Sequence, residues 1–169
     1  GRSVLVNGAS GAVGTSAVQL AAHYGAKVTA VTSAANAALV ASLGADDVIN
    51  YTDGGLVRSD MRFDVVLDCV GNLTIESGRR LLTDGGVLVL AVASLWSTIR
   101  ARGDVVAGSA PERVEDFKVL LELVAGGELT VVHDSTYDLE DIVEAHRRVD
   151  TGHKRGNVVV RPNPEGVER

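Results

Sequence analysis

The sequence predicts an α/β fold built on a parallel sheet of six strands, with helices on both faces. Short apolar runs alternate with longer segments whose apolar residues recur at helical spacing, as in parallel strands joined by helical crossovers. Aromatic residues are scarce, at 4%, so the core has to be built from Val, Leu, Ile and Ala, which suits buried parallel strands. The 169 residues are enough for one domain with a sizeable core.

Apolar spacing and glycines set the bounds of the predicted elements. The predicted strands cover residues 3–7, 27–32, 47–50, 63–68, 86–90 and 104–107. The predicted helices cover residues 13–24, 34–43, 74–82 and 114–125, and a C-terminal helix and strand follow at 139–149 and 157–160. In the first helix, Val13 and Tyr24 fall on the apolar face, whereas Thr15 and Gln19 fall on other faces. The element order predicts a doubly wound sheet.

The composition argues against several classes of partner. The formal net charge is −6 at pH 7, whereas nucleic-acid binding needs a concentrated basic face, so no nucleic-acid partner is expected. Cys69 is the only cysteine, which rules out an internal disulfide and a cysteine cluster for zinc, and we expect it to be a small core residue. There is no signal peptide and no apolar run of membrane-spanning length, so we expect a cytoplasmic protein without a membrane partner.

A glycine-rich turn, GASGAVG at residues 8–14, follows the first predicted strand and opens the first predicted helix. Gly11 has no side chain to block the approach of a pyrophosphate, and Gly14 lets the helix pack closely. The start of the helix offers free N–H groups and a positive dipole to the anion. This context predicts a Rossmann-type dinucleotide site at the switch point of the sheet. The cofactor-binding residues expected at the turn are Ala9, Ser10, Gly11, Ala12, Val13 and Gly14.

Ala9 departs from the usual Gly-x-Gly-x-x-Gly spacing because it takes the place of the first glycine. A methyl group is tolerable there if Ala9 keeps a negative φ, and Gly8 can relieve the turn.

The segment after the second strand bears on the choice of dinucleotide. NAD-binding domains favour an acidic residue there, but no Asp or Glu lies between Lys27 and Gly44. Ser33 and Asn36 can donate hydrogen bonds to a 2′-phosphate, although no Arg or Lys stands nearby in the sequence. Both residue types also suit helix capping, and the two roles are compatible. The sequence therefore favours NADPH over NADH as the cofactor.

Several separated motifs carry a family likeness: VLVNGASGAVG at 4–14, LGAD at 43–46, VINY at 48–51, DCVG at 68–71, YDLEDIVEAH at 137–146 and GHKRGNVVV at 152–160. In this order they resemble the nucleotide-binding half of the medium-chain dehydrogenase/reductase superfamily. More narrowly, they are similar to its zinc-independent quinone oxidoreductase (zeta-crystallin-like) branch. The likeness extends from Arg2 to Val160.

The resemblance implies further site residues. The Ala-x-Gly-x-x-Gly form is common in that branch, which accounts for Ala9. The branch often places a Lys at the position of Asn36 and a Tyr at the position of Tyr51, around the 2′-phosphate. Tyr51 matches and Asn36 does not, and a packing role for Tyr51 stays open beside a ligand contact. The resemblance also places Val70, Gly71 and Asn72 over the adenosine and ribose, and Ala91 and Val92 near the nicotinamide. The edge strand near Val105–Gly108 matches the one that pairs two subunits in a homodimer.

The likeness also implies how the chain is divided into domains and which of them binds the cofactor. We expect residues 1–138 to be the dinucleotide-binding domain, 139–160 to pack at the junction with a catalytic domain absent from this chain, and 161–169 to be a loose tail. Small-molecule substrate would then bind only with the missing domain, and the chain alone would be inactive. We assign no catalytic residue and no metal site, and we expect the four histidines to lie at the surface or in caps: His23, His133, His146 and His153.

The leading functional hypothesis is the NADPH-binding domain of a reductase that transfers hydride to quinones or other conjugated carbonyls. The alternatives are an enoyl-reductase module, the cofactor domain of a zinc-type alcohol dehydrogenase, and a non-catalytic NADP(H)-sensing module. A methyltransferase is less favoured, since it usually needs an acid where this chain has Ser33.

Overall fold

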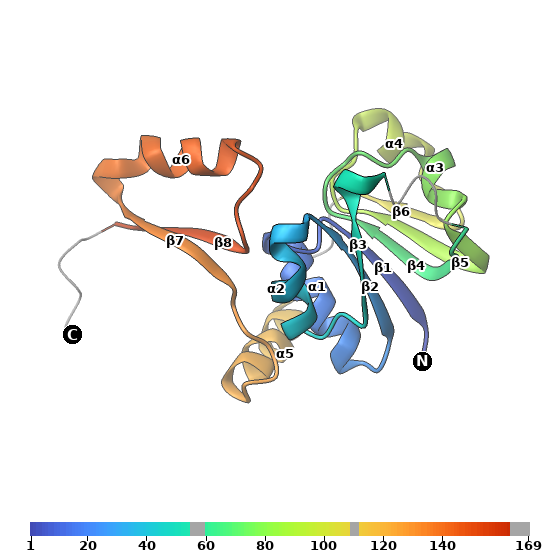
Figure 1. Ribbon diagram of the computed structural model, residues 1–169, viewed down its shortest axis with the longest axis horizontal. Helices are drawn as coiled ribbons and strands as arrows, with labels where there is room; N and C mark the ends of the chain where they lie inside the picture. The colour runs from blue at the N-terminus through green and yellow to red at the C-terminus, as the bar shows by residue number, and fades with distance from the viewer. Residues whose placement is uncertain (55–59, 109–111, 163–169) are drawn as a thin grey trace.

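A six-stranded parallel sheet forms the larger part of the molecule (Figure 1). The structure is a computed structural model that describes residues 1–54, 60–108 and 112–162. The strand order β3-β2-β1-β4-β5-β6 places β1 at the switch point, and every pair is parallel. The strands are β1 (Ser3–Asn7), β2 (Lys27–Thr32), β3 (Asp47–Asn50), β4 (Phe63–Asp68), β5 (Leu82–Leu90) and β6 (Val105–Ala107). The predicted doubly wound fold class is confirmed.

Helices cover both faces of this sheet. They are α1 (Ala12–His23), α2 (Ala37–Ser42), α3 (Ile75–Arg79) and α4 (Leu95–Arg100), with single 3-10 turns η1 (Ala34–Asn36) and η2 (Tyr51–Asp53). Helix α5 (Val114–Ala125) follows β6 along the chain and contains no buried residue. Side chains of a strand alternate between faces, so the fully buried Leu5 and Val6 enter different cores. Val6 packs in a cluster with Val18 of α1, whereas Leu5 packs in one that Ile75 of α3 joins.

A smaller C-terminal unit, residues 133–161, lies beside the main sheet (Figure 1). Strands β7 (His133–Asp138) and β8 (Asn157–Arg161) pair in parallel, and η3 (Leu139–Asp141) and α6 (Ile142–Asp150) connect them. The sequence predicted β8 and the helix but missed β7, because its residues, HDSTYD, are polar and show no apolar alternation. The domain boundary at residue 139 stays a prediction. Residues 163–169 of the predicted tail lie outside the described residues.

The predicted helix over residues 74–82 is wrong in its second half. Helix α3 ends at Arg79, and β5 begins at Leu82, four residues before the predicted strand. Leu82 pairs with Phe63 of β4, so strand pairing prevails over the local helical pattern. The short helix α4 was not predicted.

The predicted apolar face of α1 is wrong at its two ends, whereas Ala17 and Ala21 between them pack against the core. Val13 and Tyr24 are 56% and 71% exposed, whereas Thr15 and Gln19 are buried. The Gln19 side chain is satisfied where it lies: Nε2 donates to the carbonyl of Thr130 at 3.0 Å, and Oε1 accepts from the Thr130 N–H at 2.7 Å. These bonds tie α1 to the segment that leads into the C-terminal unit.

Candidate dinucleotide-binding site

The turn after β1 is shaped by a left-handed glycine followed by a buried alanine. Gly8 has φ +80°, and the N–H groups of Gly8 and Ala9 both donate to the carbonyl of Val31 at 3.1 Å. Ala9 is fully buried, and no residue other than glycine has positive φ in the described ranges. Ala9 therefore meets the predicted condition of a negative φ, and Gly8 takes the left-handed conformation that the turn needs.

Gly11 and Gly14 lack side chains for different reasons. A Cβ on Gly14 would lie 2.1 Å from the carbonyl oxygen of Gly8 and 2.8 Å from the Cα of Ala9, so the close approach of α1 to the turn requires glycine. A Cβ on Gly11 would meet only the oxygen of Gly8, at 3.4 Å. The protein itself leaves room at Gly11, beside the first turn of α1, whose N–H groups have no intrahelical partner. This is the arrangement that an approaching pyrophosphate needs.

A cavity of about 400 Å³ lies over this turn, at the carboxyl ends of β1, β2 and β4. Its position at the switch point is where open α/β sheets bind ligands. The predicted residues that line it are Ser10, Gly11, Ala12, Val13, Gly14, Ser33, Asn36, Tyr51, Val70 and Asn72. Ala9 is buried beneath them. The structure therefore brings together the residues predicted for the pyrophosphate and, except for Gly71, those predicted for the adenosine and ribose.

The residues predicted for the nicotinamide end lie apart from this cavity. Val92 lines an adjacent cavity of about 940 Å³ beside α3 and α4. Gly71, which was predicted over the adenosine and ribose, lines this adjacent cavity as well, and Asn72 lines both cavities. Ala91 is exposed and lines neither of these two; its N–H donates to the carbonyl of Asp68 at 2.9 Å. The assignment of Ala91 and Val92 to the nicotinamide stays a prediction.

Asp68 organises the loop over the cavity, and sequence reasoning missed it. The side chain is fully buried and accepts a hydrogen bond from Nδ2 of Asn7 at 2.9 Å. The same Nδ2 donates to Oδ1 of Asn72 at 2.7 Å. The carboxylate also accepts from three N–H groups of the following loop, at 3.0–3.1 Å: those of Val70, Gly71 and Leu73. An Asp and an Asn ending neighbouring parallel strands are the pattern that could have revealed this network.

Ser10, Thr32 and Asn36 form a polar cluster at the end of β2. Ser10 Oγ accepts from Thr32 Oγ1 at 2.9 Å and from Asn36 Nδ2 at 3.1 Å. Asn36 is 9% exposed, and its Oδ1 has no hydrogen-bond partner within the described residues. Ser33 and Asn36 occupy N-cap positions, but neither side chain makes a capping bond, so their expected capping role is wrong. An unsatisfied buried acceptor is rare and costly, and Oδ1 is enclosed by protein rather than open to the cavity that Asn36 lines.

The single cysteine and the histidines are not arranged for chemistry. Cys69 packs against the core beside α1, as expected, and burial raises the pKa of its thiol to about 11, with the Asp68 carboxylate adding to the shift. The thiol is therefore protonated near neutral pH. All four histidines are exposed. No group of three His, Cys, Asp or Glu side chains in residues 1–54, 60–108 and 112–162 could hold a metal ion.

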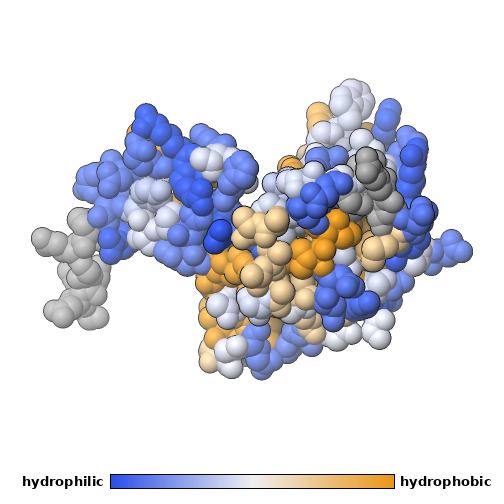
Figure 2. All heavy atoms as spheres, in the orientation of Figure 1, coloured by the Kyte–Doolittle hydropathy of each residue, from blue (hydrophilic) through white to orange (hydrophobic). Residues whose placement is uncertain are grey.

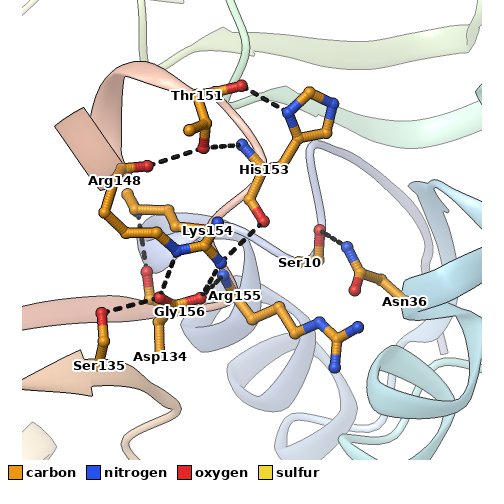
Figure 3. Close-up of polar contacts among 10 residues, drawn as sticks. All are labelled: Ser10, Asn36, Asp134, Ser135, Arg148, Thr151, His153, Lys154, Arg155 and Gly156. Atoms are coloured by element: carbon orange, nitrogen blue, oxygen red, sulfur yellow. Dashed lines mark hydrogen bonds and ion pairs between the residues drawn. The ribbon is translucent and has the colours of Figure 1, made fainter.

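The C-terminal unit reaches the same cavity, which the sequence did not predict. Val149, Gly152, His153 and Lys154 contribute to its lining. The Gly156 N–H donates to the carbonyl of Ser10 at 2.8 Å. Lys154 Nζ donates to the carbonyl of Gly156 at 2.8 Å (Figure 3). The basic segment before β8 is thereby joined directly to the glycine-rich turn.

Comparisons with known proteins agree with this geometry. The family model described as zinc-binding dehydrogenase matches residues 43–160. The mouse mitochondrial NAD(P)H oxidoreductase RTN4IP1 is 34% identical over 193 residues, covering 95% of this chain and 48% of the mouse protein. The quinone oxidoreductase of Coxiella burnetii superposes with a TM-score of 0.85 and 27% identity, over 96% of this chain and 53% of that one.

A mycobacterial protein solved in complex with NADPH, Rv1454c, has a TM-score of 0.74 and 26% identity, over 96% of this chain and 57% of its own. The chain thus spans about half the length of the relatives it matches. The family match covers well over half of its residues. The chain therefore belongs to the zinc-binding dehydrogenase family, within the medium-chain dehydrogenase/reductase superfamily.

Proposed function

We propose that this chain is the NADPH-binding part of an oxidoreductase that transfers hydride to quinones or other conjugated carbonyl compounds. The observation that carries the proposal is the cavity over the glycine-rich turn, where a Cβ on Gly11 would meet only one protein atom within 4 Å. Free N–H groups at the start of α1 can bind an anion there, and the Asp68 network holds the loop beside the proposed ribose site.

Three observations support NADPH as the preferred cofactor. The end of β2 carries no carboxylate, which would repel a 2′-phosphate. Ser33 and Asn36 line the cavity with neutral polar groups. The mycobacterial structure is a complex with NADPH, and the name of the mouse relative includes NAD(P)H. A quinone-type acceptor is supported by the name of the Coxiella burnetii protein.

The roles of this chain's own residues follow from the geometry. The N–H groups of Ala12 and Val13 would bind the pyrophosphate, and Asn72, fixed by Asn7, would orient the adenosine side. When bound, the nicotinamide supplies the hydride. We propose that the chain alone binds NADPH but reduces quinones poorly, because a substrate must be held against the nicotinamide ring by further residues.

The family description includes zinc, and the described residues do not fit it. They contain no cluster of ligating side chains, so no part of the proposal involves a metal.

Titration calorimetry with NADPH and NADH tests the proposal. We expect both to bind, NADPH more tightly, and Gly11→Val to abolish binding of both because its side chain would fill the pyrophosphate position. If neither cofactor binds, the proposed function is wrong; if both bind equally, only the NADPH preference is wrong. Turnover of a quinone by a longer form of the protein would separate an enzyme from a non-catalytic sensing module.

We also propose a homodimer through β6 and a cytoplasmic location. β6 is an edge strand, and Val106 on it is 54% exposed. Val106→Pro should give a monomer by light scattering if this edge pairs two copies.

The proposed cytoplasmic location needs a separate test. No helix in the described ranges is long and apolar enough to span a membrane. The name of the mouse relative contains the word mitochondrial. Cell fractionation decides the location.

A further inference from the structure

The last residue of β1 and the first residue of the glycine-rich turn form an Asn-Gly pair, Asn7-Gly8. It is the only asparagine followed by glycine in the 169 residues. Such a pair is chemically labile, because glycine is flexible and has no Cβ to obstruct the attack of its backbone nitrogen on the preceding side-chain amide. Both residues line the dinucleotide cavity. A reactive dipeptide therefore forms part of the wall of the candidate site.

The closed turn holds each group that the reaction would need to move. Asn7 is 3% exposed, and its Nδ2 donates to Oδ1 of Asp68 at 2.9 Å and to Oδ1 of Asn72 at 2.7 Å. The Gly8 N–H donates to the carbonyl of Val31 at 3.1 Å, which protects its proton from solvent. The backbone of Asn7 is paired with Val31 of β2 and with Asp68 of β4. Reaction at Asn7 therefore requires these contacts to open first.

We propose that Asn7 is a latent deamidation site, silent while the turn is closed and reactive when it opens. In the open turn the Gly8 nitrogen loses its proton to solvent and attacks Cγ of Asn7. The new N–Cγ bond closes a succinimide ring, the Cγ–Nδ2 bond breaks, and the side-chain nitrogen leaves as ammonia. Water then opens the ring at one of its two carbonyls, which leaves aspartate or isoaspartate at this position. Water is the only co-reactant.

Neither product can rebuild the contacts of the asparagine. An ionised aspartate only accepts hydrogen bonds, so at position 7 it would face the Asp68 carboxylate without a donor between them and leave Oδ1 of Asn72 unpaired. Isoaspartate also routes the backbone through the side-chain carbon just before Gly8. Asp68 holds the loop beside the cavity, and Asn72 lines the cavity. Deamidation should therefore weaken dinucleotide binding, and the loss is irreversible.

A bound dinucleotide should protect Asn7 from this reaction. This step rests on the proposed function. A ligand that binds only the closed turn lowers the population of the open turn by a factor set by the ratio of free ligand to Kd. NADPH at about 100 times its Kd should therefore slow deamidation about a hundredfold. Chains that stay without cofactor would be the ones that lose the ability to bind it.

Peptide mass spectrometry of the 169-residue chain, incubated in mildly alkaline buffer with and without denaturing urea, tests the inference. Asn7 should convert to aspartate and isoaspartate in urea, and more than about a hundredfold more slowly in the folded chain, in line with the small population of opened molecules. The internal controls are Asn50 and Asn157, which precede Tyr51 and Val158. Both should stay amides, because these side chains crowd the attacking nitrogen.

Two variants test the consequence for binding. Asn7→Asp reproduces one product and should weaken NADPH at least about tenfold in calorimetry, because it sets two carboxylates against each other. The matched control is Asn7→Ser, which keeps a hydroxyl donor for Asp68, adds no charge and cannot deamidate. It should weaken NADPH less and stay unmodified in urea. Urea unfolding of both variants separates a loss of binding from a loss of the fold.

The outcomes separate this inference from the proposed function. A folded chain that deamidates at Asn7 as fast as the unfolded chain overturns the inference, and so does an unfolded chain in which Asn7 reacts no faster than Asn50. A folded Asn7→Asp chain that binds NADPH as tightly as the wild type also overturns it. The protection by NADPH is measured at a low urea concentration where the folded chain reacts measurably. If NADPH binds there without slowing the reaction, the ligand does not hold the turn closed; if it does not bind at all, the proposed function is wrong.

Discussion

The main sheet and the C-terminal unit are stabilised in different ways. Strands β1, β2 and β4 bury whole aliphatic side chains, among them Leu5, Val28 and Val66 at 0% exposure. In residues 133–161 the buried residues are Ala145 and Gly156. Ion pairs hold that unit together instead, and its visible surface is mostly hydrophilic (Figure 2). We therefore expect the sheet to supply most of the free energy of unfolding, whereas the C-terminal unit contributes residues to the lining of the dinucleotide cavity.

The largest expected effect breaks the sheet and spares the C-terminal unit. Leu88 in β5 is fully buried in the core cluster, so Leu88→Ala should lower the free energy of unfolding by about 3 kcal/mol. Val159 in β8 is 41% exposed, so Val159→Ala should lower it by less than about 1 kcal/mol. Urea unfolding measures both values. Equal losses would contradict the separation of the two regions.

The fold was largely predictable because its causes are local. The six strands are apolar runs, and turns at Gly25 and Gly44 end their helices with positive φ, so pattern and turn chemistry agree. The failures have non-local causes. Pairing with Phe63 begins β5 early at Leu82, and β7 is a strand only because β8 lies beside it.

The second expected effect separates stability from binding within the glycine-rich turn. Gly14→Ala places a Cβ 2.1 Å from a backbone oxygen, so it should lower the free energy of unfolding by about 2 kcal/mol, within the range for overpacking. Gly11→Ala is the matched control, because its Cβ meets no atom closer than 3.4 Å. It should leave unfolding unchanged and still weaken NADPH in calorimetry. A Gly11→Ala chain that binds NADPH normally would mean that the pyrophosphate lies elsewhere.

The third effect concerns the polar contacts of the C-terminal unit and depends on pH. The Arg148 guanidinium holds the pKa of Asp134 well below its ordinary value of 3.8. A depressed pKa stabilises the fold fully above the unfolded value, and this contribution is lost as the pH falls through 3.8 toward the folded pKa. Asp134→Asn should therefore cost about 1 kcal/mol at neutral pH, a modest figure because Arg148 is partly exposed to screening solvent.

The gap between wild type and Asp134→Asn should stay constant from pH 7 to about pH 5 and narrow below it. Urea unfolding at a series of pH values measures this gap. A gap that persists undiminished at low pH would show that the Asp134 carboxylate is not the source of the difference.

The candidate site was half predictable. The turn from Ala9 to Gly14 follows from chain order alone, since strand, turn and helix are consecutive. Arg155 lies 122 residues from Ser33 in the sequence, yet both line one cavity, and the Gly156 N–H donates to the carbonyl of Ser10. Periodicity and residue spacing in the sequence do not predict such a contact between distant segments. Asp68 was missed for another reason. An aspartate at the end of a strand is also the ordinary way for a strand to end at the surface, and its role here depends on the N–H groups of the following loop that donate to it.

The smallest expected effect concerns the sheet side of the dinucleotide cavity, opposite the C-terminal unit. Asn36→Lys places a cation on the sheet side of the site, where the sequence offers none. It should favour NADPH over NADH by about 0.5 kcal/mol, at the low end for a charge-assisted contact, because solvent screens a cation at the mouth of an open cavity. Calorimetry with both cofactors on the wild type and the variant measures this difference, and an unchanged ratio of the two affinities would show that residue 36 does not face the 2′-phosphate.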